Sequence, residues 1–147
     1  MKRNISNELN NVNLIKYALY KDYHIPEDLS FINLTQERIL MTVKDSVNVS
    51  MVSIARAIGL EKGPFSQTVD KLENLNLIER VRSIEDKRLV NLHLTEKGNL
   101  LVSRVQKSMD EHFDKAVENL SEQELDQFFD ALETLKTTAN KLLKNNK

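Results

Sequence analysis

Apolar residues recur every three to four positions along most of the chain, and they alternate with polar residues mainly between positions 78 and 94. The first spacing places apolar side chains on one face of a helix, and the second places them on one face of a strand. The pattern predicts two strands flanking residues 85–88, a short extended piece over 47–49, and helices over 5–23, 35–44, 51–58, 64–75, 96–120 and 122–143. The fold class that follows is mainly α with a small β-hairpin.

Residues that favour helix ends stand at the boundaries of this pattern. N-cap side chains accept a hydrogen bond from the first turn, and Gly or Asn adopts the left-handed conformation that often follows a helix. The expected N-caps are Thr35, Ser50, Thr95 and Ser121, the last in a capping box with Glu124, the expected ends are Gly59 and Asn76, and Pro64 is expected in the first position of its helix. Only Gly59 to Gly63 separates the third and fourth helices, which is compatible with a helix-turn-helix.

A charged hairpin follows the fourth helix directly. Its tip, Glu85-Asp86-Lys87-Arg88, is costly to bury, so it projects into solvent. The Asp86-x-Arg88 pattern and the sequence Leu-Thr-Glu-Lys-Gly over 94–98 resemble the wing of the MarR family of winged-helix transcription regulators. The resemblance implies a winged helix-turn-helix with dimerisation helices at both ends of the chain.

The resemblance also implies boundaries within one compact chain that is an obligate dimer. Residues 1–34 would form an N-terminal dimerisation helix and connector, residues 35–98 the DNA-binding domain, and residues 99–147 the C-terminal dimerisation helices. The apolar stripe of the last helix is broad for a monomer of this length to cover. The residues expected to meet their counterparts across a two-fold axis are Leu9, Val12, Phe128, Leu132 and Leu135.

The candidate DNA contacts lie on the fourth helix and the hairpin. Amide, hydroxyl and cationic side chains bind base edges or phosphates, and Arg88 has the size and charge to enter a narrow minor groove, as the matching arginine commonly does in the family. The expected contacts are Ser66, Gln67, Thr68, Lys71, Arg82, Lys87 and Arg88. Asp70 is expected to orient a neighbouring cation, either Arg88 or Lys71, and Asp86 to hold the wing loop or pair with Arg88.

Both features have plainer interpretations. A polar helix face is often merely solvated, and a charged turn can protect a sheet edge from aggregation. A winged helix can also serve only in protein interaction. The primary hypothesis is a sequence-specific repressor that occupies a palindromic operator in double-stranded DNA as a homodimer, and the alternative is a protein-interaction module without DNA binding.

Members of the family often bind small aromatic or anionic molecules in the crevice between the dimerisation helices and the winged helix. The residues expected to border such an effector site are Tyr17, Tyr20, His24, Phe31 and His112. Each could equally be ordinary core. The three histidines lack a His-x-x-x-His spacing or a cysteine partner, so neither a metal site nor a cofactor is expected.

The composition excludes some classes of function and disfavours others. The absence of cysteine excludes disulfides and thiol-based sensing, and the net charge of −1 means that DNA binding must rest on where the cations lie. No nucleophile with a base and no glycine-rich phosphate loop is evident, so an enzyme is not expected. The longest apolar run is Tyr17 to Tyr20, and no signal-peptide core follows the basic start, which favours a cytoplasmic protein without a membrane span.

Overall fold

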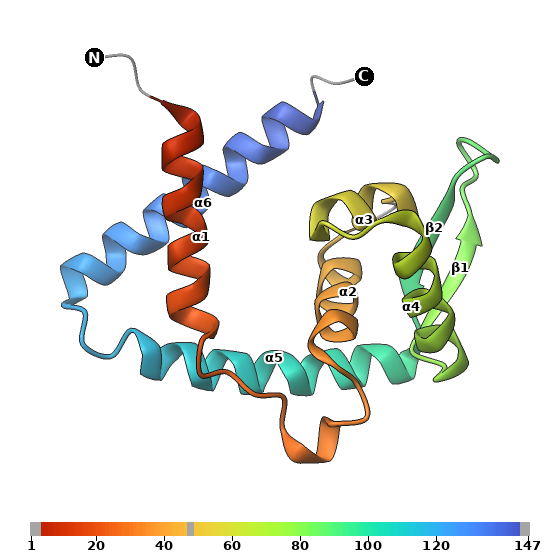
Figure 1. The fold of residues 1–147 in the computed structure, drawn as a ribbon, viewed down its shortest axis with the longest axis horizontal. Coiled ribbons are helices and arrows are strands. Elements are labelled where there is room, and N and C mark those ends of the chain that lie inside the picture. The colour runs from red at the N-terminus through yellow and green to blue at the C-terminus, as the bar shows by residue number, and fades with distance from the viewer. Residues whose placement is uncertain (1–3, 47–48, 145–147) are drawn as a thin grey trace. The chain divides into compact units, whose positions relative to one another are not determined.

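The computed structural model describes residues 4–46 and 49–144. Figure 1 shows mostly helices and one hairpin, as the sequence pattern predicts. The elements are α1 (Ile5–Tyr20), η1 (Glu27–Leu29), α2 (Leu34–Asp45), α3 (Met51–Ile58), α4 (Lys62–Asn74), β1 (Ile78–Arg82), β2 (Val90–Leu94), α5 (Glu96–Ala116) and α6 (Glu122–Lys144). The mainly α fold with a small β-hairpin is therefore confirmed.

The chain divides into two compact units. Residues 20–110 form the winged-helix unit, and residues 1–19 with 111–147 form the helical unit. In the winged-helix unit α2 contacts α3, α4 and β2, and α4 also contacts β1. Its hydrophobic residues that are at most 3% exposed are Leu29, Ile32, Ile39, Leu40, Ile54, Phe65, Val69, Leu72, Leu77, Ile78, Leu92, Val102 and Val105. Since fully burying one such side chain stabilises a fold by about 1.5–3 kcal/mol, this unit contains a core of its own.

Two helix boundaries in the N-terminal part differ from the sequence predictions. The first helix ends at Tyr20 and not at Tyr23, because Tyr23 turns its ring into the core and its N–H donates to the Tyr20 carbonyl, 3.0 Å away. Thr35 is not the N-cap of α2. Asn33 takes that place in a reciprocal capping box with Gln36, so the helix starts earlier.

The helix-turn-helix begins and ends largely as predicted. The Ser50 hydroxyl accepts the Ser53 N–H and caps α3, and Gly59 ends α3 with a φ of 72°. Pro64 is not the first residue of α4, because the helix starts at Lys62 after Glu61. Pro64 still lies in the first turn, where its missing N–H breaks no intrahelical bond.

The hairpin is antiparallel, with Ile78 opposite Leu94 and Arg82 opposite Val90. The Ser83 N–H continues the pairing by donating to the Leu89 carbonyl at 3.0 Å. Of the extended piece expected over 47–49, residues 47–48 lie outside the described residues.

The segment after the hairpin fastens the end of α4 to the start of α5. The Thr95 hydroxyl donates to the Asn76 carbonyl at 2.7 Å and accepts the Gly98 N–H at 3.0 Å, so it caps α5 as predicted. The Lys97 ammonium donates to the Leu75 carbonyl at 2.9 Å. Two of these bonds thus use the carbonyls of Leu75 and Asn76, the two residues that follow α4.

Two backbone positions in this junction have particular requirements. Asn76 has a φ of 56°, the left-handed conformation expected from the sequence. At Gly98 an added Cβ would overlap the carbonyl oxygen of Leu77. The glycine of the Leu-Thr-Glu-Lys-Gly sequence is therefore needed for close packing.

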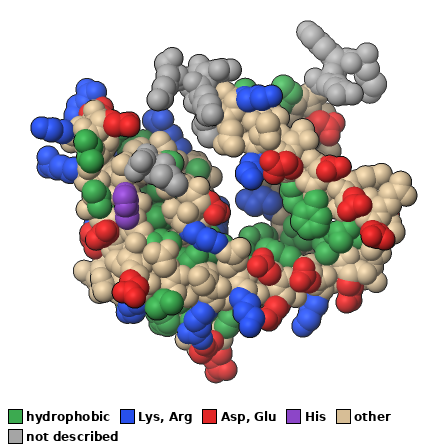
Figure 2. Space-filling model, turned by 180° about the vertical axis from the view of Figure 1, so that it is seen from behind, with side chains coloured by type: hydrophobic (Ala, Val, Ile, Leu, Met, Phe, Trp, Pro, Cys, Tyr) green, Lys and Arg blue, Asp and Glu red, His purple; other side chains and the backbone are tan. Residues whose placement is uncertain are grey.

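The helical unit contains α1, α6 and the last residues of α5. No side chain of α1 is buried. The side chains of α6 are described over residues 122–142, and none of these is buried. The capping box at the start of α6 forms as predicted: Ser121 donates its N–H and hydroxyl to the Glu124 carboxylate, and its Oγ accepts the Glu124 N–H. Figure 2 shows hydrophobic side chains open to the surface over this unit.

Candidate nucleic-acid interface

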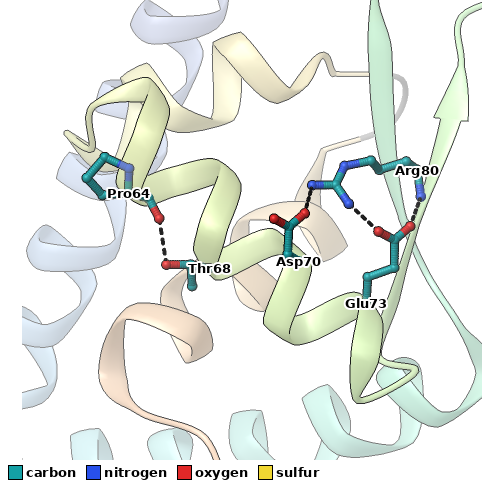
Figure 3. A network of polar contacts seen from close by, with 5 residues as sticks. All are labelled: Pro64, Thr68, Asp70, Glu73 and Arg80. Carbon is teal, nitrogen blue, oxygen red and sulfur yellow. Dashed lines mark hydrogen bonds and ion pairs between the residues drawn. The ribbon is translucent and has the colours of Figure 1, made fainter.

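The exposed face of α4 presents polar side chains of different availability. Gln67 and Lys71 are exposed, and Ser66 is half-buried. The Thr68 hydroxyl donates to the Pro64 carbonyl one turn earlier, at 2.8 Å, and Thr68 is half-buried (Figure 3). Of the four α4 residues expected to contact DNA, Gln67 and Lys71 are thus the most accessible, while Thr68 is held to its own helix.

The wing tip is organised around one carboxylate. Asp86 accepts the Arg88 backbone N–H at 3.0 Å, the Arg88 Nε at 3.1 Å and the Arg88 Nη2 at 3.0 Å. The Asp86 N–H donates to the Ser83 hydroxyl at 3.2 Å. Asp86 therefore both holds the loop and pairs with the guanidinium, which are the two roles considered from the sequence.

The Asp86 pair leaves Arg88 accessible. The hydrogen bonds from the Arg88 side chain and then from its N–H lower the pKa of Asp86, and the same pair raises the pKa of Arg88. The Arg88 side chain nevertheless remains 89% exposed. A fixed, permanently charged guanidinium at the tip of a hairpin is suited to an anionic groove.

A second ion-pair network joins the helix to the wing (Figure 3). The Arg80 guanidinium of β1 binds the carboxylates of Asp70 and Glu73 on α4, and the Arg80 N–H donates to Glu73 Oε1 at 3.3 Å. The expected partner of Asp70, either Arg88 or Lys71, is therefore wrong. The reason is spatial, because β1 runs along α4 and brings Arg80 to a residue ten positions earlier.

The remaining wing cations are free to meet a ligand. Arg82 and Lys87 are exposed, and no ion pair between the described residues involves either of them. Figure 2 shows Lys and Arg side chains gathered over the hairpin end of the winged-helix unit. The local charge is thus positive although the chain as a whole has a net charge of −1.

A groove of about 590 Å³ lies between α3, the start of α4 and the wing. Its walls combine cationic and apolar side chains, among them Arg56, Lys62, Arg88, Met51, Val52 and Leu89. The sequence pattern did not single out Arg56 or Lys62. Helical periodicity predicts that Arg56 and Lys62 are exposed. It does not predict that they line the same groove, because that depends on how α3 and α4 pack.

Two of the residues expected at an effector site belong to the helical unit. Tyr17 is exposed on α1. His112 is half-buried on α5, where its Nε2 lies 2.8 Å from the Leu19 carbonyl oxygen and its ring meets Phe113 edge-on. His112 therefore makes contacts within this unit typical of a packed residue.

The other three belong to the winged-helix unit. Tyr20 lies edge-on to Tyr23, with ring centroids 6.0 Å apart. The pKa of Tyr20 is raised mainly by burial and to a smaller extent by the negative charge of Glu37. His24 borders a shallow cavity of about 500 Å³ that Tyr23 also lines. Phe31 is exposed. An effector site formed by these residues stays a prediction.

Within residues 4–46 and 49–144 no group of three or more His, Asp or Glu side chains is placed to hold a metal ion. No helix there has the length and apolar character to span a membrane.

Residues 32–90 match the model of the MarR family. The structure resembles MarR from E. coli in its apo form, at 20% identity and a TM-score of 0.67, over 92% of this chain and 98% of that one. It also resembles FabT from Streptococcus pneumoniae in complex with DNA, at 23% identity and a TM-score of 0.59, over 94% of both chains.

A third similar structure is the PcaV transcriptional regulator from Streptomyces coelicolor in complex with its natural ligand, at 19% identity and a TM-score of 0.59, over 91% of this chain and 92% of that one. At these identities the likeness concerns the fold. The match of residues 32–90 covers α2, α3, α4 and the hairpin as far as Val90, and it includes the Asp86-x-Arg88 pattern but not the Leu-Thr-Glu-Lys-Gly sequence over 94–98. Residues 32–90 thus match the MarR family of winged-helix transcription regulators, and the chain as a whole has the fold of the MarR structures.

Proposed function

We propose that this regulator is a repressor that acts as a homodimer on a palindromic operator. The observation that carries the proposal is the wing tip, where Asp86 fixes a guanidinium that remains almost fully exposed. Two α4 helices would enter successive major grooves about 34–36 Å apart, and the wings would flank them. Occupancy of the operator would then exclude other proteins from the same DNA.

The residues have distinct proposed roles. Gln67 and Ser66 read base edges in the major groove, because amide and hydroxyl groups match their donors and acceptors. Lys71, Arg82 and Lys87 bind phosphates and add affinity for any sequence. Thr68, half-buried and bonded to its own helix, contributes a contact at most through its remaining surface. A protein with this task works in the cytoplasm, where its DNA lies.

Arg88 gives the direct test. Arg88→Ala should weaken operator binding and reduce the slope of log K against log salt by up to about two, because each of two wings loses one groove contact. Arg88→Lys should recover the slope but only part of the affinity, since an ammonium is harder to dehydrate in a narrow groove. Fluorescence anisotropy across a salt series measures both quantities.

Asp86→Ala is the matched variant for the same experiment. It should weaken binding less than Arg88→Ala, because it loosens the loop but keeps the cation. Unaltered affinity and slope in Arg88→Ala would mean that the wing does not contact DNA. The alternative function, a protein-interaction module, would then be favoured.

Ligand control is the finer part of the proposal. PcaV is similar in fold and was solved with its natural ligand, and a small aromatic or anionic molecule could likewise change the half-site separation of this protein. Aromatic acids that raise the unfolding temperature should lose that effect in Tyr20→Ala or His112→Ala. Shifts that are the same in the parent and both variants would place the effector site elsewhere.

A further inference from the structure

We propose that Arg80 is a positioning residue: by binding Asp70 and Glu73 it holds the wing at a fixed angle to α4, so that both elements meet one half-site in register. The inference rests on the DNA binding proposed above. It assigns Asp70 and Glu73 as anchors and gives none of the three residues a DNA contact.

The network attaches an open sheet edge to the helix. A two-stranded sheet leaves edge N–H groups unpaired, and the Arg80 N–H is taken by Glu73 Oε1 at 3.3 Å. The Glu73 carboxylate also binds Arg80 Nη1, so one α4 side chain holds both the backbone and the side chain of β1. Because α4 and β1 are in contact, the bonds between Glu73 and Arg80 restrain the wing at its base.

The Arg80 fork is suited to this task in a way that a lysine is not. Its two terminal nitrogens bind different carboxylates, Nη2 to Asp70 Oδ1 at 2.5 Å and Nη1 to Glu73 (Figure 3). A planar guanidinium can bridge two acceptors at fixed positions, whereas an ammonium is a point charge on a flexible stem. The Arg80 side chain is only 26% exposed, against 89% for Arg88.

The charge of the network argues against a phosphate contact. One guanidinium and two carboxylates give the group a net charge of −1, next to a surface proposed to bind a polyanion. A contact with phosphate would require a free cation, and here both terminal nitrogens of Arg80 already have carboxylate partners. Like charge near DNA reduces affinity, so the network contributes through geometry.

This charge yields a discriminating prediction. If Asp70 only repels DNA, Asp70→Asn should increase affinity for every sequence. If Asp70 anchors the wing, Asp70→Asn should lower the preference for the operator, because the wing and α4 no longer reach their sites together. Asn retains the size of Asp, so the change tests the charge-assisted bond with little change in packing.

The DNA experiment uses full-length parent, Asp70→Asn, Arg80→Lys and Arg80→Ala, with Glu79→Gln as the control. Glu79 is exposed on the same strand and has no described hydrogen bond or ion pair to α4. The probes are a palindromic duplex selected by the parent protein from a randomised pool and a scrambled duplex of equal length and composition. Anisotropy gives the ratio of the two affinities at each salt concentration.

We expect Asp70→Asn, Arg80→Lys and Arg80→Ala to lower this ratio by about five- to tenfold, a part of the discrimination that a base-reading contact supplies. Glu79→Gln should leave the ratio unchanged. The salt slope in Arg80→Ala should equal that of the parent. A ratio that stays at the parent value in Asp70→Asn and Arg80→Lys would overturn the proposal, and so would a slope reduced by about two in Arg80→Ala, which marks phosphate contacts.

A measurement without DNA separates this inference from the proposed function. The chain has no cysteine, so spin labels can be attached at Asn74→Cys on α4 and Ile84→Cys on the wing, both exposed. Excess unlabelled chain ensures that each distance is measured within one chain. Distances from double electron–electron resonance should be narrowly distributed in the parent and in Glu79→Gln, and broader in Asp70→Asn and Arg80→Lys.

The two readouts have separate consequences. Equal distance distributions in the parent and all variants would refute the positioning role, whatever the protein does with DNA. Broader distributions in a protein that does not prefer its selected duplex would support the positioning role and contradict the repressor proposal. Thermal unfolding of Asp70→Asn should stay near that of the parent, because the Asp70 side chain is 57% exposed and exposed ion pairs contribute only about 0–1 kcal/mol.

Discussion

Helices α4 and α6 are both amphipathic, yet their apolar side chains have opposite surroundings. In α4, Phe65, Val69 and Leu72 are at most 2% exposed. In α6, Phe129 is 60% exposed and Leu135 is 49% exposed, and no described side chain of the helix is buried. The winged-helix unit therefore completes its core within one chain, whereas the helical unit presents apolar surface.

The difference suggests a division of work between the two units. The winged-helix unit needs no partner to place Gln67, Lys71 and Arg88, because its own core fixes α4 and the hairpin. Exposed apolar residues recur along both α1 and α6, among them Leu9, Ile15, Phe129 and Leu135, and in the homodimer proposed above a second copy of the chain would cover them. DNA affinity would then depend on the helical unit, although no DNA contact is proposed there.

The largest expected effect comes from breaking the helical unit. Leu132→Glu combined with Leu135→Glu should convert the protein to a monomer and weaken operator binding by about 100-fold or more, because linked binding of two half-sites is lost. Sedimentation velocity and anisotropy measure the two effects. Thr134→Glu combined with Thr137→Glu adds the same charge on another face of α6 and should leave the dimer intact.

A charged Leu132 and Leu135 variant that remains dimeric would show that α6 does not form the interface. A variant that becomes monomeric but keeps its affinity would show that one winged helix suffices. Either result would remove the proposed division between the units.

The sequence predicted the elements because the signals for them are local. Helical and alternating periodicity gave the order of elements, and Gly59 and Asn76 marked helix ends by their left-handed conformations. The end of the first helix was misplaced because Tyr23 packs into the core, and another error lies where two local signals compete. Asn33 and Thr35 are both good caps, and only the capping box with Gln36 in the structure decides for Asn33.

The site was predictable only in part. Arg88 and Asp86 are two positions apart, so their pairing could be considered from the sequence. Asp70 pairs with Arg80 because β1 passes beside α4, which is a tertiary relation that no helical spacing contains. Arg56 and Lys62 reach one groove for the same kind of reason.

The second prediction tests whether the core of the winged-helix unit is as tightly packed as its burial indicates. Gly98→Ala places a methyl group against the Leu77 carbonyl and should destabilise the protein by about 1–3 kcal/mol, because the junction between α4 and α5 must shift. Gly63→Ala is the matched control, since nothing lies within 4 Å of its added Cβ. It should stabilise α4 by up to about 1 kcal/mol. Urea unfolding measures both, and equal effects would contradict the close packing at Gly98.

The smallest expected effect concerns a buried carboxyl group in the winged-helix unit. The Glu37 side chain is buried on α2 and accepts a hydrogen bond from the Tyr23 hydroxyl at 3.1 Å. Burial raises the pKa of Glu37, and the bond from Tyr23 offsets part of that increase. The folded protein therefore keeps this proton at pH values where the unfolded chain has released it, and stability should fall as the pH rises through that interval.

Glu37→Gln removes the titration but keeps an oxygen that accepts the Tyr23 hydroxyl. As the pH rises above the ordinary pKa of a glutamate, the free energy of unfolding should decrease less in Glu37→Gln than in the parent, with a slope difference of at most about 1.4 kcal/mol per pH unit for one proton. Urea unfolding at a series of pH values measures this, with Glu61→Gln as an exposed carboxyl control. Parallel curves for parent and Glu37→Gln would mean that Glu37 ionises equally in the folded and unfolded protein. A flatter pH dependence in Glu37→Gln would instead show that the core of the winged-helix unit holds the Glu37 carboxyl group mainly in its neutral form. The carboxyl groups on the exposed surface of α6 face no such requirement.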